Sequence, residues 1–250
     1  MSIELSQDMF WGGKIILEQP TTGYRVGNDA VLLAASTTMG FTGSVLDVGS
    51  GVGAVGLMIA KRHERVHVSG VERDEVICDI SRQNAIVNKV STRFVAHAGD
   101  MFVQDPRWPQ EGFDHVVTNP PFFSRRMGLN ENYRTLARSL DQDITLAQWL
   151  FRCMTLVRHR GWLRAIFPVQ ALPEVLGMLS GRAGNIHCLP LCARAGDRAT
   201  RVLLAAQRNV KTSMSLLSPL VMHQQDGSYT AEVDLVLRNG SLLEGFEQAC

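Results

Sequence analysis

The chain has no apolar run long enough to cross a bilayer, and its first residues lack the basic start and apolar stretch of a signal peptide. We therefore expect a cytoplasmic protein that does not bind membranes. Neither sign of charge is in excess, because 25 basic residues face 24 acidic ones and the net charge is +1. That balance excludes no partner, since an RNA-binding enzyme needs a local basic face and not a basic total. Internal repeats and low-complexity segments are also absent from the sequence.

The five cysteines lack the paired spacing of a zinc site. Cys188 and Cys192 could form half of such a site, but no second pair of Cys or His ligands follows at a usual spacing. We therefore expect free, buried thiols, no metal, and a reducing compartment.

Short apolar runs alternate with amphipathic segments through most of the 250 residues. The alternation predicts an α/β fold with a doubly wound, mostly parallel sheet, as in Rossmann-like proteins. The last two predicted strands have no helix between them, so they form an antiparallel hairpin edge. The seven expected strands are residues 45–48, 66–71, 92–96, 113–118, 162–167, 185–191 and 200–207. The expected helices are residues 28–39, 54–62, 75–88, 146–159 and 172–181.

This pattern divides the chain into three parts. Residues 1–43 form a lead-in, residues 44–210 form the α/β domain, and residues 211–250 form an extension that packs on the same domain. The lead-in is too short for a separate domain.

A glycine-rich turn follows the first predicted strand of the domain and precedes a helix, with glycines at Gly49, Gly51 and Gly53. Glycines let a ligand approach the backbone, and the helix start offers free N–H groups. Glu72 ends the next strand, about 20 residues on, where a carboxylate can hold two ribose hydroxyls. Residues 51–56 also fit a dinucleotide fingerprint, so the turn alone does not identify the ligand.

The most specific feature is the tetrapeptide that follows the strand at 113–118. Proline cannot join a strand ladder, and it holds the residue before it in an extended conformation. The strand therefore ends in a stiff tip at the edge of the sheet where open α/β folds bind ligands. Such a tip presents two fixed acceptors to an amine on a planar ring, with an aromatic surface beside them. Its residues are Asn119, Pro120, Pro121 and Phe122.

Acidic residues at the strand ends favour S-adenosylmethionine over a nicotinamide cofactor. Asp47 lies two residues before the first glycine and could accept a hydrogen bond from the cofactor's amino group, directly or through water. Asp100 follows the third strand, where it can accept from an adenine amino group. A nicotinamide oxidoreductase would leave the pair of prolines unexplained.

Together these residues resemble class I S-adenosylmethionine-dependent methyltransferases of the adenine-N6 type, over about residues 20–210. Within that group the chain looks most like the bacterial tRNA1(Val) adenine-N6-methyltransferase family, which modifies an adenosine beside the anticodon. Residues 23–34 resemble that family's segment before the glycine turn, which implies cofactor contacts for Tyr24, Arg25 and Asp29. Residues 194–204 resemble its arginine-containing loop.

The resemblance implies transfer of a methyl group to the N6 amine of an adenosine in RNA, with tRNA as the expected partner. Asn119 then contacts both cofactor and target amine, and Phe122 stacks on a base that has left its stack. The family often has Ala-Arg-His-Glu after the tip, but here Ser139 and Leu140 follow Ala-Arg, which puts the substrate in doubt and not the chemistry. The oligomeric state stays open. The residues expected near RNA phosphates are Lys14, Arg125, Arg126, Arg134 and Arg138.

Three rival functions stay open at this point. A protein glutamine N5-methyltransferase also uses an Asn-Pro-Pro tip, but such enzymes usually have a helical domain before the glycine turn. An rRNA guanine-N2 methyltransferase often has a second domain. A non-catalytic cofactor-binding scaffold would not need to keep residues 119–122.

Overall fold

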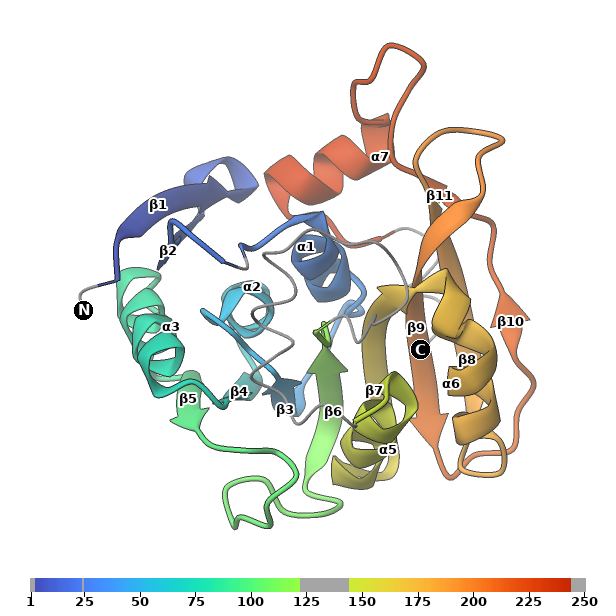
Figure 1. Cartoon of the computed structure of the whole chain (residues 1–250), viewed down its shortest axis with the longest axis horizontal. Helices are drawn as coiled ribbons and strands as arrows, with labels where there is room; N and C mark the ends of the chain where they lie inside the picture. Colours follow the sequence, from blue (N-terminus) through green and yellow to red (C-terminus); the bar gives the residue numbers. More distant parts are fainter. Residues whose placement is uncertain (1–2, 24, 122–143, 244–250) are drawn as a thin grey trace.

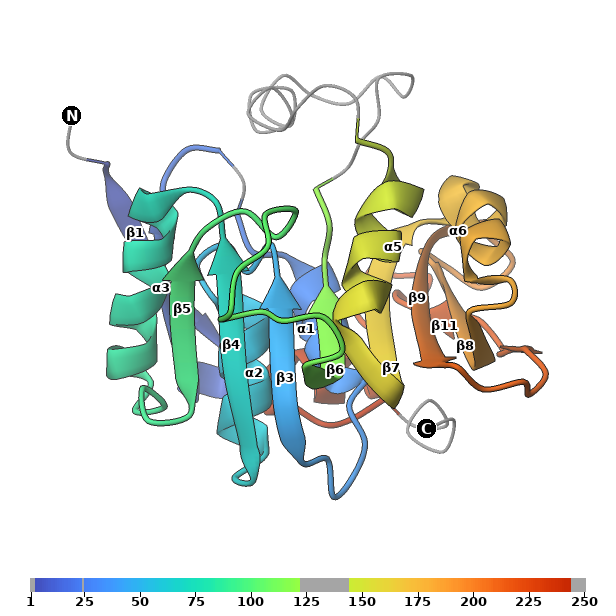
Figure 2. The same cartoon turned by 90° about the horizontal axis from the view of Figure 1, so that it is seen from below.

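The computed structural model describes residues 3–23, 25–121 and 144–243, and the predicted site residues Tyr24, Phe122, Arg125, Arg126, Arg134 and Arg138 lie outside them. The described chain forms a central sheet with helices on both faces (Figures 1 and 2). None of the helices in these three ranges is both long and apolar enough to cross a membrane.

The central sheet has nine strands in the order β10-β8-β9-β7-β6-β3-β4-β5, and β11 also pairs with β8. Strands β5, β4, β3, β6 and β7 are mutually parallel, whereas β9 is antiparallel to both β7 and β8. The strands are β3 (Gly43–Val48), β4 (Val66–Glu72), β5 (Phe94–Ala98), β6 (Phe113–Thr118), β7 (Val157–Pro168), β8 (Ala183–Cys192), β9 (Ala199–Arg208), β10 (Ser215–Leu216) and β11 (Leu220–Val221).

The strand order creates a switch point beside β3. The chain runs outward from β3 to β4 and β5, then returns to form β6 on the other side of β3. Ligands of open α/β sheets bind outside the carboxyl ends of the strands at such a point. The glycine turn follows β3 and the Asn-Pro-Pro tip follows β6, so the fold brings both motifs to the same crevice.

Helices cover the sheet in two layers, which Figure 2 shows on its near and far sides. Strand residues alternate between the layers, because neighbouring side chains of a strand point to opposite faces. In β3, for example, Val45 belongs to the core under α1, α2 and α3, whereas Leu46 belongs to the core under α5 and α6. The helices are α1 (Asn28–Ala35), α2 (Ala54–Arg62), α3 (Glu75–Val87), α5 (Leu146–Leu156) and α6 (Leu172–Leu179).

A β-hairpin precedes the domain and packs on α3. It consists of β1 (Leu5–Phe10) and β2 (Ile15–Pro20), joined by the short turn η1 (Trp11–Gly13). The segment after β11 contains α7 (Ala231–Asp234) and η3 (Leu235–Asn239), and η3 packs against α1. The predicted division at residues 43 and 210 stays a prediction.

The structure extends and corrects several predicted elements. All seven predicted strands are present, but the sheet has nine because the two-residue strands β10 and β11 add to β8. The antiparallel β8–β9 pair is therefore not the outermost part of the sheet. The helix predicted over 146–159 ends at Leu156, because Val157 already pairs with Phe113 as the first residue of β7. The helix predicted over 28–39 ends at Ala35.

Candidate functional site

The glycine turn after β3 is fixed to the neighbouring strand by its own backbone. The N–H groups of Gly49 and Ser50 both donate to the carbonyl of Val71, at 2.9 and 3.1 Å. Gly53 has a φ of +89°, and a Cβ there would come within 2.4 Å of the Ser81 hydroxyl on α3. The sequence must therefore place glycine at this position for the turn to pass over α3.

Asp47 supports this turn from inside the protein. It is 1% exposed, and its Oδ2 accepts a hydrogen bond of 2.9 Å from the N–H of Gly56 in the first turn of α2. Burial raises the pKa of the Asp47 carboxyl to about 7, with a smaller raising effect from the charge of Glu72 and an opposing effect from the Gly56 N–H. Asp47 is deeply buried, and its hydrogen bond with Gly56 organises the start of α2.

Glu72 and Asp100 lie at the carboxyl ends of β4 and β5. The two Glu72 carboxylate oxygens accept hydrogen bonds of 3.0 Å each from the N–H groups of Gly51 and Asp74. Asp100 accepts from the N–H of Phe102 at 2.9 Å. A carboxylate has about four acceptor positions, so both acids can still receive hydroxyl or amine donors of a ligand.

Two buried hydrogen bonds hold Thr118, the residue directly before the Asn-Pro-Pro tip. The Thr118 hydroxyl donates to the carbonyl of Val48 at 2.9 Å, and the indole N–H of Trp149 donates to the same hydroxyl at 3.0 Å. Val48 and Thr118 are paired residues of β3 and β6. Gly49 and Asn119 follow these paired residues directly, so the start of the glycine turn and the start of the tip lie beside each other.

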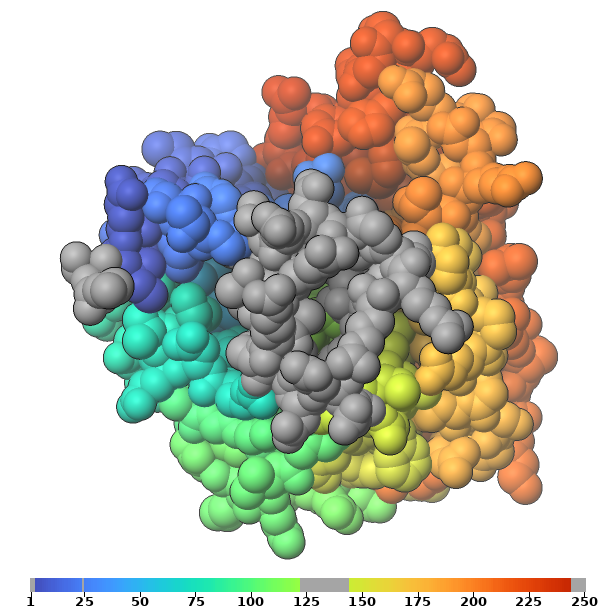
Figure 3. Space-filling model, in the orientation of Figure 1, coloured from blue at the N-terminus to red at the C-terminus, as the bar shows by residue number. Residues whose placement is uncertain are grey.

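Asn119 is partly exposed and Pro120 is buried, so the tip presents its asparagine at the end of the sheet while its first proline packs inside. Figure 3 looks onto this end of the molecule, with the blue N-terminal residues lying directly beside the teal residues of α3.

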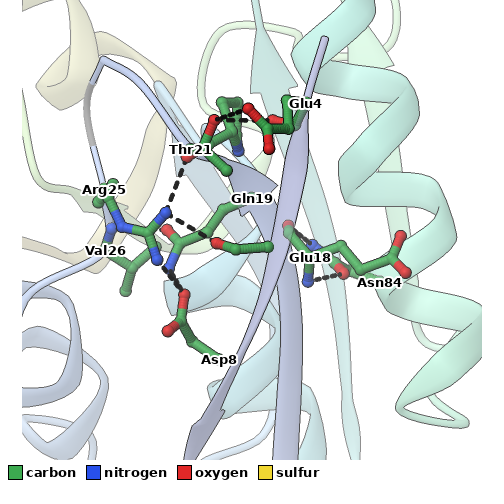
Figure 4. Close-up of polar contacts among 10 residues, drawn as sticks. Glu4, Asp8, Glu18, Gln19, Thr21, Arg25, Val26 and Asn84 are labelled. Carbon is green, nitrogen blue, oxygen red and sulfur yellow. Dashed lines mark hydrogen bonds and ion pairs between the residues drawn. The ribbon is translucent and has the colours of Figure 1, made fainter.

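The structure also describes three other predicted residues, Asp29, Arg25 and Lys14. Asp29 is the second residue of α1, and its carboxylate pairs with Arg201 of β9 at 3.2 Å. Arg25 is directed into the hairpin, where it bonds Asp8 and donates to Ser6 at 2.8 Å (Figure 4). Lys14 lies at the hairpin turn beside the last turn of α2, at the opposite end of that helix from the glycine turn. The structure therefore places Asp47, the glycines, Glu72, Asp100 and Asn119 at the carboxyl ends of four neighbouring strands, whereas Arg25 contacts the hairpin and Lys14 lies at its turn.

Three residues that support this end of the sheet are not among the site residues predicted from the sequence. They are Thr118 at the end of β6, Trp149 on α5 and Ser50 in the glycine turn. The sequence does contain a signal for Thr118. A buried polar residue directly before the tip needs a hydrogen-bond partner, and that partner must lie close to the tip. Trp149 could not be found this way, since its partner lies 31 residues away in the sequence.

The crevice has the features that a nucleotide-like cofactor requires. A Cβ at Gly51 would meet no atom of the described residues within 4 Å, so the backbone there borders open space, and its φ of +54° suits glycine. The Ser50 hydroxyl, by contrast, is buried against Gly70 of β4 and has no hydrogen-bond partner among the described residues. With carboxylates at or near the carboxyl ends of three adjacent strands, these residues fit S-adenosylmethionine.

Comparison with known proteins agrees with this geometry. The family model described as methyltransferase small domain matches residues 25–141. Curated relatives named tRNA1(Val) (adenine(37)-N6)-methyltransferase include one from Porphyromonas gingivalis, 28% identical over 90% of this chain and 91% of the relative. Another, from Flavobacterium psychrophilum, is 33% identical over 64% of this chain and 68% of the relative.

Solved structures share the fold. A protein described as a predicted O-methyltransferase from Agrobacterium tumefaciens has a TM-score of 0.68 at 23% identity, covering 86% of this chain and 97% of that one. The M. jannaschii protein TYW2, solved in complex with AdoMet, has a TM-score of 0.56 at 12% identity, covering 83% and 87%. This chain is an S-adenosylmethionine-dependent enzyme and belongs to the methyltransferase family that includes the tRNA1(Val) (adenine(37)-N6)-methyltransferases.

Proposed function

We propose that this enzyme methylates the N6 amine of an adenosine in RNA, and that its substrate is a tRNA with the target base near the anticodon. The observation that carries the proposal is the position of Asn119, one residue after the Thr118–Val48 hydrogen bond that joins the tip to the start of the cofactor turn. The names of the relatives, which specify adenine 37 of tRNA1(Val), support the same substrate.

The tip suits an amine whose lone pair is delocalised into a ring. The Asn119 side-chain oxygen and the Pro120 carbonyl would each accept one hydrogen of the N6 amine, which favours a more tetrahedral and more nucleophilic nitrogen. When bound, S-adenosylmethionine supplies an electrophilic methyl group. Holding the nitrogen in line with that group can contribute several kcal/mol to catalysis. No strong general base is required, because the amine becomes acidic as the new bond forms.

The remaining predicted residues have proposed roles around this centre. Asp47, Glu72, Asp100 and the three turn glycines would hold the cofactor, and Asp29 would border it at the start of α1. Phe122 would stack on the target base, which must leave its own stack to reach the tip. An unpaired base in an anticodon loop meets that demand at little energetic cost.

The proposal is tested by methyl transfer from labelled S-adenosylmethionine to unmodified bulk tRNA, with the labelled nucleosides identified by mass spectrometry. We expect N6-methyladenosine. Purified rRNA and a mixture of cell proteins serve as parallel acceptors in the same assay. Labelled N2-methylguanosine in rRNA, or methylated glutamine in protein, would contradict the proposal and favour one of the two rival enzymes.

The same assay distinguishes an enzyme from a scaffold. If the wild-type chain binds S-adenosylmethionine but labels no acceptor, a non-catalytic cofactor-binding protein is the better account. If it labels tRNA, mapping the modified position by nuclease digestion decides whether the target lies beside the anticodon.

A further inference from the structure

Two buried asparagines, one on α3 and one at its C-cap, face the N-terminal hairpin. Asn84 and Asn88 lie one helical turn apart, and they are 0% and 4% exposed. A buried side-chain amide needs hydrogen-bond partners for its oxygen and for both amide hydrogens. Both asparagines find most of these partners in the backbone of β2.

The two side chains bind β2 in the same way. The Asn84 Oδ1 accepts from the N–H of Glu18 at 2.8 Å, and its Nδ2 donates to the carbonyl of Glu18 at 2.9 Å (Figure 4). Asn88 makes the matching pair with Ile16, at 2.9 and 2.6 Å. Because Ile16 and Glu18 are two residues apart, their backbone groups point to the same edge of the strand. The asparagines therefore take the place of a neighbouring strand along that edge.

Only Asn84 also touches the cofactor turn. Its Nδ2 makes a second hydrogen bond of 3.0 Å to the carbonyl of Val52, between Gly51 and Gly53. The second bond of Asn88 goes instead to the carbonyl of Asn84, within α3 itself. One fully buried amide thus binds the hairpin and the glycine turn at the same time.

The surroundings strengthen this link. Ser81 lies three residues before Asn84 on α3, and its hydroxyl occupies the space that a Cβ at Gly53 would need. On the other side of Val52, the N–H of Gly51 donates to Glu72. The turn is therefore held between Glu72 and the buried face of α3, and Asn84 is the described residue that connects this face to both the turn and the hairpin.

We infer that Asn84 is a positioning residue that couples the N-terminal hairpin to the cofactor turn, so that cofactor binding and hairpin docking stabilise each other. The inference rests on the cofactor assignment and not on the RNA substrate. It gives the hairpin, which lies outside the matched methyltransferase segment, a role in the cofactor site. Such coupling must be reciprocal, because it is a free energy shared between two sites.

The first test uses the unmodified protein. Hydrogen exchange of the hairpin amides is followed by NMR with and without S-adenosylmethionine or S-adenosylhomocysteine. We expect either ligand to slow exchange at Glu18 several-fold, while amides of the distant β8–β9 pair serve as the reference. Binding without any added protection at Glu18 would overturn the inference, whatever the behaviour of the variants.

The second test compares Asn84→Ala with Asn88→Ala by calorimetric titration with S-adenosylmethionine. Both variants lose two bonds to β2, so both should weaken hairpin protection in the free protein. Only Asn84→Ala also loses the bond to Val52. We therefore expect its Kd for S-adenosylmethionine to rise about tenfold, which is the effect of one buried hydrogen bond. The Kd of Asn88→Ala should rise less than about threefold.

Ligand-induced protection of the hairpin should persist in Asn88→Ala and disappear in Asn84→Ala. Equal effects of the two variants on Kd would overturn the coupling role and leave Asn84 an ordinary structural residue. A wild-type chain that binds no S-adenosylmethionine would overturn the cofactor assignment and the coupling with it, whereas binding without methylation of RNA would count only against the proposed substrate.

Discussion

The two halves of the crevice are built in different ways. In the half formed by β3, β4 and β5, carboxylates accept hydrogen bonds from the chain's own backbone, as Asp47 does from Gly56 and Glu72 does from Gly51. In the half formed by β6, a hydroxyl and an indole N–H hold the strand end before the tip. The groups that shape the first half are thus the groups expected to bind the ligand. In the second half, the supporting groups and the reacting tip are different residues.

This difference has a consequence for mutagenesis. Substitutions in the β3–β5 half should change stability and cofactor affinity together, because one side chain serves both. Substitutions at the β6 tip should change the rate of methyl transfer alone.

Replacing Asn119 with alanine should lower kcat by about 10²–10³-fold, the loss seen when one acceptor or donor at a reacting centre is removed. The Kd for S-adenosylmethionine, measured by calorimetric titration, should stay within a few-fold of the wild-type value. A large loss of cofactor affinity would contradict the division into two halves and the role of Asn119 on the target amine.

Replacing Glu72 with alanine should raise the cofactor Kd by about 10–100-fold, because hydrogen bonds to a charged group contribute about 1.5–3 kcal/mol. Glu72→Gln keeps one carbonyl acceptor, so its Kd for the cofactor should lie between those of the wild type and Glu72→Ala. Glu75 is an exposed residue in the first turn of α3. Glu75→Ala is therefore a matched control, and it should leave the cofactor Kd unchanged. An unaltered Kd in Glu72→Ala would refute its assignment.

Asp47 should make the stability of the free protein depend on pH. Its pKa is raised from 3.8 to about 7, so the folded chain holds this proton more tightly than the unfolded chain. The resulting stabilisation is complete below about pH 4 and is lost as the pH rises to about 7. Asp47→Asn keeps an acceptor for the Gly56 N–H and cannot ionise, so at pH 8 it should be more stable than wild type by on the order of 2 kcal/mol.

Denaturant unfolding of both proteins at pH 5 and pH 8 checks this expectation. The difference between them should grow with pH, and a constant difference would show that Asp47 does not titrate in this range. Because only the difference between the two proteins is compared, the titration of ionising groups distant from Asp47 cancels.

Replacing Trp149 with phenylalanine should have the smallest effect. It removes the indole N–H from Thr118 but keeps an aromatic ring, so we expect a loss of about 1 kcal/mol in stability and a kcat lowered by a few-fold. Trp108→Phe is a matched control, because that buried indole also donates one hydrogen bond, to Val103 at 3.1 Å. Equal kcat values in the two variants would argue against support of the tip by Trp149.

The sequence defined best those elements whose boundaries are set by local chemistry. Helix α2 and strand β6 have the predicted limits. The glycine turn determines where α2 begins, and the pair of prolines determines where β6 ends. The end of α5 was misplaced, since the helix passes directly into β7 at Val157 without a turn residue.

The N-terminal hairpin was not predicted, for a different reason. Strand β1 alternates between exposed and half-buried positions, and four residues join it to β2, of which Trp11, Gly12 and Gly13 have positive φ. It lacks the two-residue turn that identifies a hairpin in a sequence. Its hydrogen bonds to Asn84 and Asn88 join residues that lie 66 and 72 positions apart in the sequence. No local sequence pattern reveals such distant pairs.

The most direct test of the central claim uses an anticodon stem–loop RNA in two forms. One contains adenosine at the target position, and the other contains purine riboside, which has the same ring without the N6 amine. Single-turnover reactions with labelled S-adenosylmethionine should give N6-methyladenosine from the first RNA and no product from the second, which should still compete for binding. Equal methylation of both RNAs would show that the tip does not act on the N6 amine and would contradict the account.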